Sequence, residues 1–84
     1  MTYSIEVSDS AIKQLKKFDR TVAEIIAKKL NSIRDDPFRY LKKLEGSKLW
    51  RLRIMDYRAI VDVIVTQKKI YVLRIGRRES VYGT

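Results

Sequence analysis

The sequence predicts an α+β fold in which a two-helix hairpin packs on one face of a small antiparallel sheet, in the order β-α-α-β-β-β. Three observations lead to this prediction. Residues 1–7 alternate apolar and polar side chains, residues 8–36 carry apolar side chains at helical spacing, and residues 49–75 contain three alternating runs separated by two short turns. The length of 84 residues fits one domain, which we expect to span residues 1–84.

The first strand and the first helix occupy residues 1–18. Tyr3, Ile5 and Val7 alternate with polar neighbours, which is typical of a half-buried strand. Ser8, Asp9 and Ser10 can each accept a hydrogen bond from an orphan amide at a helix start. The predicted helix runs to about Phe18, and its apolar stripe consists of Ala11, Ile12, Leu15 and Phe18.

A second helix is predicted from about Thr21, because Thr21 and Glu24 have the spacing of a capping box. Its apolar stripe consists of Val22, Ile25, Ile26, Leu30 and Ile33. Asp36-Pro37 ends it, since the residue before a proline is disfavoured in the α region. Residues 37–48 then predict a loop pinned to the core by Leu41 and Leu44.

Three strands are predicted at 49–54, 58–65 and 69–75, with turns at Met55-Asp56 and Thr66–Lys68. Turns this short make neighbouring strands antiparallel. Side chains alternate across a strand, so each strand has a core face and an open face. The predicted core face carries Trp50, Leu52, Ile54, Ala59, Val61, Val63, Val65, Tyr71, Leu73 and Ile75.

The same alternation predicts a basic open face that binds nucleic acid. It places Arg51, Arg53, Arg58 and Arg74 there, Arg77 and Arg78 extend it, and Lys48 precedes it. The formal net charge is +9, and residues 47–84 carry nine Lys and Arg against three acids. An arginine fork suits phosphate. The alternatives are a merely solvated surface or pairing with Asp56 and Asp62, but two acids cannot neutralise five or six arginines.

Composition excludes several classes of function. The chain has no cysteine and no histidine, so we expect no disulfide, no transition-metal centre and no cofactor. No apolar run approaches the roughly 18–20 residues of a membrane span, and charges interrupt residues 1–20, so no signal peptide is expected. These features predict a cytoplasmic protein without membrane contact.

Several motifs, taken in order, resemble the RelE family of toxins from type II toxin–antitoxin modules. They are Leu44-Glu45-Gly46, Trp50-Arg51-Leu52-Arg53, Tyr57-Arg58-Ala59-Ile60, Ile75-Gly76-Arg77-Arg78 and Val81-Tyr82. The resemblance covers nearly the whole chain and the order of its elements. It implies a RelE-like fold and a ribonuclease that cuts mRNA in the ribosomal A site without metal, by attack of a 2′-OH on the adjacent phosphate. It also implies an acidic RelB-like antitoxin as partner, beside the ribosome and mRNA.

The resemblance assigns catalytic roles to Arg51, Arg53, Arg58, Arg78 and Tyr82. The first three would hold the scissile phosphate and stabilise developing charge. Arg78 would lie by the leaving 5′ oxygen, and Tyr82 would stack on a base or orient the 2′-OH, unless its ring packs on the core edge. Many relatives have lysines where this chain has Arg51 and Arg53. Because arginine does not give up its proton in proteins, Tyr82 is the remaining candidate for a general base.

Two other functions stay open. A ParE-like toxin shares the fold but inhibits DNA gyrase and is no nuclease, and a third reading is a non-catalytic RNA-binding domain. Retention of the five residues assigned above favours the nuclease. Trp50 could stack on a base, but the alternation places it in the core with Leu52 and Ile54.

Overall fold

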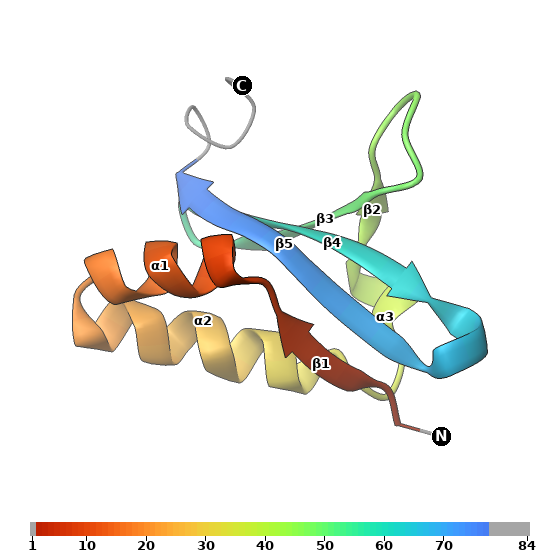
Figure 1. Ribbon diagram of the computed structural model, residues 1–84, viewed down its shortest axis with the longest axis horizontal. Helices are drawn as coiled ribbons and strands as arrows, with labels where there is room; N and C mark the ends of the chain where they lie inside the picture. Colours follow the sequence, from red (N-terminus) through yellow and green to blue (C-terminus); the bar gives the residue numbers. More distant parts are fainter. Residues whose placement is uncertain (1, 78–84) are drawn as a thin grey trace.

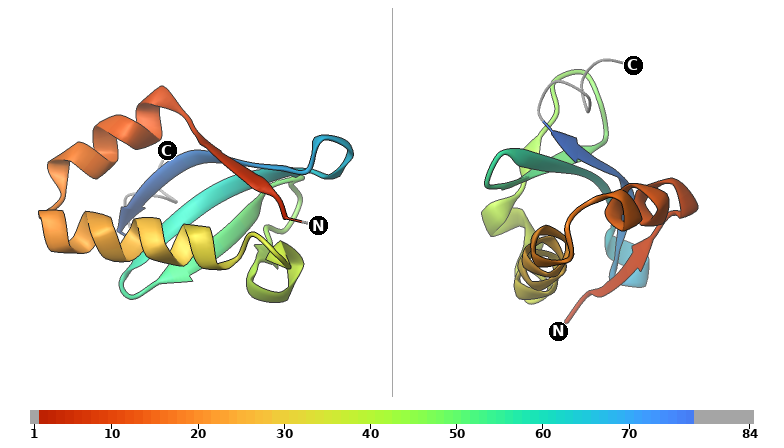
Figure 2. Two further views of the ribbon diagram at one scale, coloured as in Figure 1. Left: turned by 90° about the horizontal axis from the view of Figure 1, so that it is seen from below. Right: turned by 90° about the vertical axis from the view of Figure 1, so that its left-hand side faces the viewer.

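The computed structural model describes residues 2–77 and has an α+β fold, as predicted (Figure 1). The elements are β1 (Ser4–Val7), α1 (Asp9–Lys17), α2 (Arg20–Ser32), α3 (Pro37–Tyr40), β2 (Lys42–Lys43), β3 (Trp50–Ile54), β4 (Tyr57–Ile64), a 3-10 turn (Val65–Gln67) and β5 (Lys69–Arg77). Helices α1 and α2 lie on one side of the sheet (Figure 2). The other side is called the open face below. No helix in residues 2–77 is long and apolar enough to cross a membrane.

The five strands form one sheet in the order β1-β5-β4-β3-β2. Four of them form an antiparallel meander, but β1 pairs with β5 in parallel, so the sheet is mixed rather than purely antiparallel. Ser4 N–H donates to Lys68 O at 2.8 Å, and Ser8 N–H donates to Val72 O at 2.9 Å. The helical hairpin carries the chain from β1 across the sheet to its far edge, which leaves the outer edge of β5 available for β1.

Side chains from both helices bury the inner face of the sheet. Ala11, Ile26 and Ile33 are fully buried, and Leu30 nearly so, as the helical spacing predicted. They pack with Leu52, Ile54, Ala59, Val61, Ile70, Val72 and Ile75 in one core. Ile12 and Ile25 were predicted in the stripe but are 38% and 39% exposed, because they lie at its rims.

The predicted N-cap is confirmed for α1 and wrong for α2. Ser8 caps α1 as predicted, since its Oγ accepts from Ala11 N–H at 3.1 Å. The predicted capping box of α2 is wrong, because the helix already begins at Arg20 with Asp19 as its N-cap. Glu24 instead pairs with Arg20 one turn earlier, at 3.4 Å on the exposed surface.

A β-bulge in β5 changes which side chains reach the core. Ile60 lies opposite Arg74 and Val61 opposite Val72, so Leu73 is an extra residue in β5. Before the bulge the alternation is opposite to the prediction. Ile70 and Val72 are fully buried in the core, whereas Tyr71 and Leu73 are only partly buried.

Beyond the bulge, Ile75 is in the core and Arg74 is exposed, as predicted. Strand β1 ends at Val7, so the edge of β5 past that point has no neighbouring strand among residues 2–77. Side chains take its place: Gln14 Oε1 accepts from Ile75 N–H at 2.6 Å, and Ser8 Oγ donates to Leu73 O at 2.7 Å.

The loop predicted at 37–48 contains a short helix and a short strand. Pro37 occupies the first turn of α3, where its missing N–H costs nothing. Lys42 and Lys43 form β2 against β3, and the connecting hairpin turns through Gly46 at φ 71. A left-handed backbone of this kind is easy for glycine and strained for other residues. The predicted strand end at Val65 is also corrected, because Val65 is 51% exposed in the 3-10 turn.

Candidate functional site

Basic side chains line up across the open face of the sheet. The strand register places Lys42, Arg51, Ile60 and Arg74 in one row across β2, β3, β4 and β5. The next row holds Arg53, Arg58 and Gly76. Residues directly opposite on neighbouring strands point to the same side. Lys42, Arg51, Arg53, Arg58 and Arg74, which we call the arginine face, therefore share one surface.

Arg58 lies at the centre of this arrangement and is only 8% exposed. Its neighbours across the sheet are Arg53 on β3 and Gly76 on β5, and Gly76 has no side chain to fill the space beside it. Nη1 donates to Tyr57 O at 3.1 Å, whereas buried Nε has no hydrogen-bond partner within residues 2–77. A buried cationic donor without a partner lowers the stability of the fold by roughly several kcal/mol, and a bound anion would offset this cost.

Arg53 adds a second positive charge beside Arg58. It is exposed, and like charges directly opposite on neighbouring strands repel each other. Within the part of the chain that the structure describes, no carboxylate forms an ion pair with Arg53. The pair therefore favours an anion that both guanidinium groups can bind, and a phosphate accepts two parallel N–H bonds from each such fork.

Ile60 gives the arginine face an apolar centre. It is 4% exposed, it lies between half-buried Arg51 and exposed Arg74, and it belongs to the open face rather than to the main core. Because so little of Ile60 is exposed, the surface that a ligand meets on this face is mainly basic.

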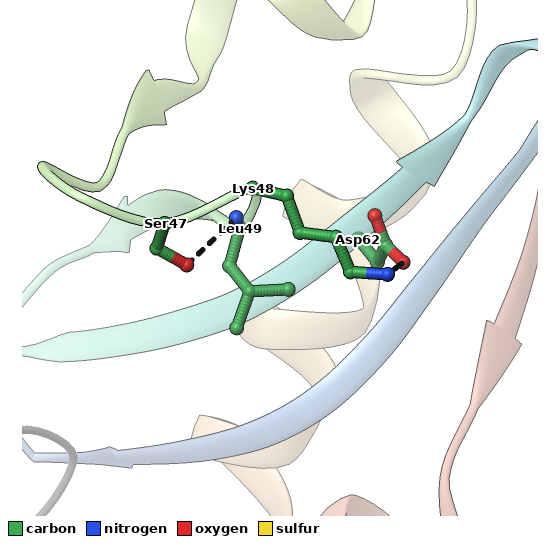
Figure 3. Close-up of polar contacts among 4 residues, drawn as sticks. All are labelled: Ser47, Lys48, Leu49 and Asp62. Atoms are coloured by element: carbon green, nitrogen blue, oxygen red, sulfur yellow. Dashed lines mark hydrogen bonds and ion pairs between the residues drawn. The ribbon is translucent and has the colours of Figure 1, made fainter.

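The acidic residues lie toward the other end of the open face. Lys48 Nζ pairs with Asp62 at 3.4 Å, and the Ser47 hydroxyl accepts from Leu49 N–H at 3.0 Å in the same loop (Figure 3). Lys69 pairs with Glu6 at 3.4 Å. Asp62 therefore forms an ion pair with a lysine. Lys48, predicted to bind RNA, is held in this ion pair with its side chain 81% exposed.

Arg77 does not extend the arginine face. It lies opposite Tyr57 on the helix-covered side of the sheet, with its guanidinium 5.7 Å from the centre of the Tyr57 ring. There it lines an open groove of about 830 Å³, together with Lys17, Phe18 and Val22. Arg78 and Tyr82, both predicted to be catalytic, lie outside the described residues.

Sequence reasoning missed Lys42 as a member of the basic row. Its strand has only two residues, and it followed a stretch predicted as loop. One signal was available: Gly46 between Leu44 and Leu49 is typical of a hairpin turn. Trp50 is half-buried against the core, as predicted, but its ring also meets Phe38 at 5.0 Å between centroids.

The sequence is similar to a known protein family and to characterised toxins. Residues 5–82 match the family described as "ParE toxin of type II toxin-antitoxin system, parDE". Over 82 residues the chain is 33% identical to a RelE-like toxin protein of Escherichia coli, covering 94% of this chain and 86% of that one. It is 31% identical over 83 residues to the mRNA interferase toxin RelE of Escherichia coli K12, with the same two coverages.

Solved structures agree with the sequence relatives. A chain from the archaeal RelE–RelB complex of Pyrococcus horikoshii OT3 superposes with a TM-score of 0.79 at 26% identity, covering 93% of this chain and 97% of that chain. The family match spans almost all of the sequence, and the curated relatives are matched over most of their own length. The chain thus belongs to the RelE/ParE family of toxins from type II toxin–antitoxin systems.

Proposed function

We propose that this toxin is a metal-independent endoribonuclease that cuts mRNA in the ribosomal A site and so inhibits translation in the cytoplasm. The observation that carries the proposal is buried Arg58, with a partnerless Nε inside residues 2–77 and Arg53 directly opposite. A relative named mRNA interferase toxin RelE supports the choice of mRNA as substrate.

In the proposed reaction the 2′-OH of one nucleotide gives up its proton, to Tyr82 or to water, as its oxygen attacks the adjacent phosphorus. The bond to the 5′ oxygen breaks, and a 2′,3′-cyclic phosphate forms. Negative charge grows on the phosphoryl oxygens during this step. Arg51, Arg53 and Arg58 lie on one surface and would stabilise that charge.

The remaining roles involve both ends of the site. Arg78 would donate a hydrogen bond to the leaving 5′ oxygen, which takes up a proton from water, and Tyr82 would orient the 2′-OH or stack on a base. Arg74, Arg77 and Lys48 would bind the flanking RNA, with Arg77 doing so from the helix-covered side. Because arginine keeps its proton, catalysis would rest mainly on positioning and electrostatics, with the ribosome arranging the RNA.

The proposed partner is an acidic RelB-like antitoxin. One structural relative is a RelE–RelB complex, and the net charge of +9 suits an acidic protein. An antitoxin that covers the arginine face would block RNA and remove the repulsion between Arg53 and Arg58.

A second candidate function is ParE-like inhibition of DNA gyrase. The family match to ParE toxins is the observation that favours it. A non-catalytic RNA-binding role would use the same basic surface.

One experiment separates these functions. Purified toxin is added to a translation reaction, and the 5′ ends of the mRNA are mapped by primer extension. Codon-register cuts are expected from the wild type and from Arg20→Ala, an exposed arginine on α2 that serves as the matched control. Arg58→Ala should lose them. Intact mRNA together with blocked DNA supercoiling would instead establish the gyrase function.

A further inference from the structure

Aromatic rings gather with cations at the edge of the sheet formed by β2, away from the arginine face. Phe38 on α3 is 42% exposed, and its ring meets that of Trp50 at 5.0 Å between centroids, with 60° between the ring planes. Lys43 is exposed, and its Nζ lies 5.7 Å from the centre of the Trp50 ring. Phe38 is not a member of the core, so burial does not explain its position.

The other side of α3 repeats the pattern. Tyr40 is 43% exposed, and its ring centre lies 5.1 Å from Lys29 Nζ and 5.8 Å from the Arg39 guanidinium. A single exposed aromatic residue is ordinary on a protein surface. Helix α3 has two exposed rings on four residues. Tyr40 lies close to basic residues, and Phe38 contacts Trp50, whose ring lies close to Lys43. Exposed rings beside cations form the kind of surface that binds single-stranded nucleic acid.

Strand β2 connects this surface to the arginine face. Lys42 lies opposite Arg51, and Lys43 lies opposite Trp50. Because successive side chains of a strand point to opposite sides, Lys42 belongs to the open face and Lys43 to the aromatic side. The two surfaces therefore meet at Lys42 and Lys43, which are adjacent in sequence and both exposed.

We propose that Phe38, Trp50 and Lys43 form a second RNA subsite, which binds a single-stranded stretch flanking the cleaved bond. Bases stack on the two rings, and Lys42 and Lys43 bind the phosphates as the strand crosses the β2 edge. Lys43 now lies near the ring of Trp50, and a stacked base would displace its ammonium toward the backbone of the RNA. This inference rests on the proposed function, since it takes RNA as the ligand.

RNA fits this surface better than an acidic protein does. The face of an aromatic ring carries negative partial charge, which disfavours a carboxylate and leaves a stacked base unaffected. Stacking also tolerates any base, which suits an enzyme that must hold varied mRNA. An acidic protein would gain from the lysines alone.

Trp50 gives the subsite its own signal, because it is the sole tryptophan of the chain. A short 2′-O-methyl oligonucleotide, which cannot be cut, is titrated into the protein at low salt. Binding should quench the fluorescence of Trp50. Phe38→Leu keeps an apolar contact with Trp50 but removes the stacking ring, so affinity should fall about tenfold. Val65→Ala, an exposed apolar residue in the distant 3-10 turn, is the matched control and should bind as the wild type does.

The variants also distinguish the subsite from the proposed function. Arg58→Ala should weaken binding, but at saturating oligonucleotide it should show the same decrease in Trp50 fluorescence as the wild type. If Arg58→Ala weakens binding and Phe38→Leu does not, the proposed second RNA subsite is wrong, and the proposed function stands. If the wild type binds no oligonucleotide, the subsite is wrong, and the proposed function is decided by the cleavage assay in the translation reaction. If poly-L-glutamate quenches Trp50 and RNA does not, the surface binds an acidic protein. Thermal unfolding of Phe38→Leu checks that its fold is retained.

Discussion

Arg53 and Arg58 lie directly opposite each other on β3 and β4, on the same face of the sheet. One guanidinium is exposed, and the other is buried with its Nε lacking a partner in the described part of the chain. Such a pair costs stability in the free protein and favours binding of an anion. Function and stability therefore make opposing demands on Arg58.

Replacing Arg58 with an apolar side chain of similar length should stabilise the free toxin. We expect Arg58→Met to raise the free energy of unfolding by about 1–3 kcal/mol, because it removes a buried charge. Urea denaturation measures the change. Arg74→Met, on the same face but exposed, should stay within about 0.5 kcal/mol of the wild type. A destabilised Arg58→Met would mean that Arg58 already has its charge compensated in the free protein.

Phosphate should stabilise the wild type through the same two arginines. At equal ionic strength, exchange of chloride for phosphate should raise the Tm more for the wild type than for Arg58→Met, since bound anion stabilises only the folded state. The comparison with the variant removes the general effect of phosphate on protein stability. Equal shifts for both proteins would exclude an anion site at Arg58.

Lysine in place of Arg51 should speed RNA cleavage. Arg51 is half-buried in the basic row, and a lysine there could lose its proton and act as a base, which arginine cannot do. We expect Arg51→Lys to increase the rate of mRNA cleavage in a translation reaction by about tenfold or more. Arg20→Lys on α2 is the control. A slower Arg51→Lys enzyme would show that bidentate phosphate binding outweighs proton transfer at this position.

Gln14 should stabilise the edge of β5 beyond the end of β1. Its Oε1 accepts from Ile75 N–H at 2.6 Å, in a part-buried position beyond the end of β1. Gln14→Leu would leave that amide without its acceptor and should lower the free energy of unfolding by about 1–3 kcal/mol. Gln14→Glu keeps an acceptor and should lose less, as judged by urea denaturation. Equal losses in the two variants would assign the effect to packing.

The arginine face could be predicted from the sequence because alternation is intrinsic to a strand. Arg51, Arg53 and Arg58 lie on regular stretches of β3 and β4, where a two-residue period is unbroken. The same rule failed for Tyr71 and Leu73, because a bulge adds one residue to β5 and reverses the pattern there. Tertiary packing sets the position of a bulge, so local sequence did not reveal it.

Two other features depended on long-range contacts. The two residues of β2 have no strand character of their own and gain it by pairing with β3. The parallel pairing of β1 with β5 joins segments more than sixty residues apart, as in Ile5 opposite Ile70. Nothing in residues 1–7 indicates which strand they will pair with.

The pairing of β1 with β5 also bears on how the toxin is made. Synthesis starts with β1 and reaches β5 near the end of the described chain, and chains begin to fold from their N-terminal part as they emerge. Ile5 and Val7 find Ile70 and Val72 only after β5 has left the ribosome. Arg74 takes its place among the other arginines at the same moment. A growing chain that still lacks β5 therefore has no complete arginine face.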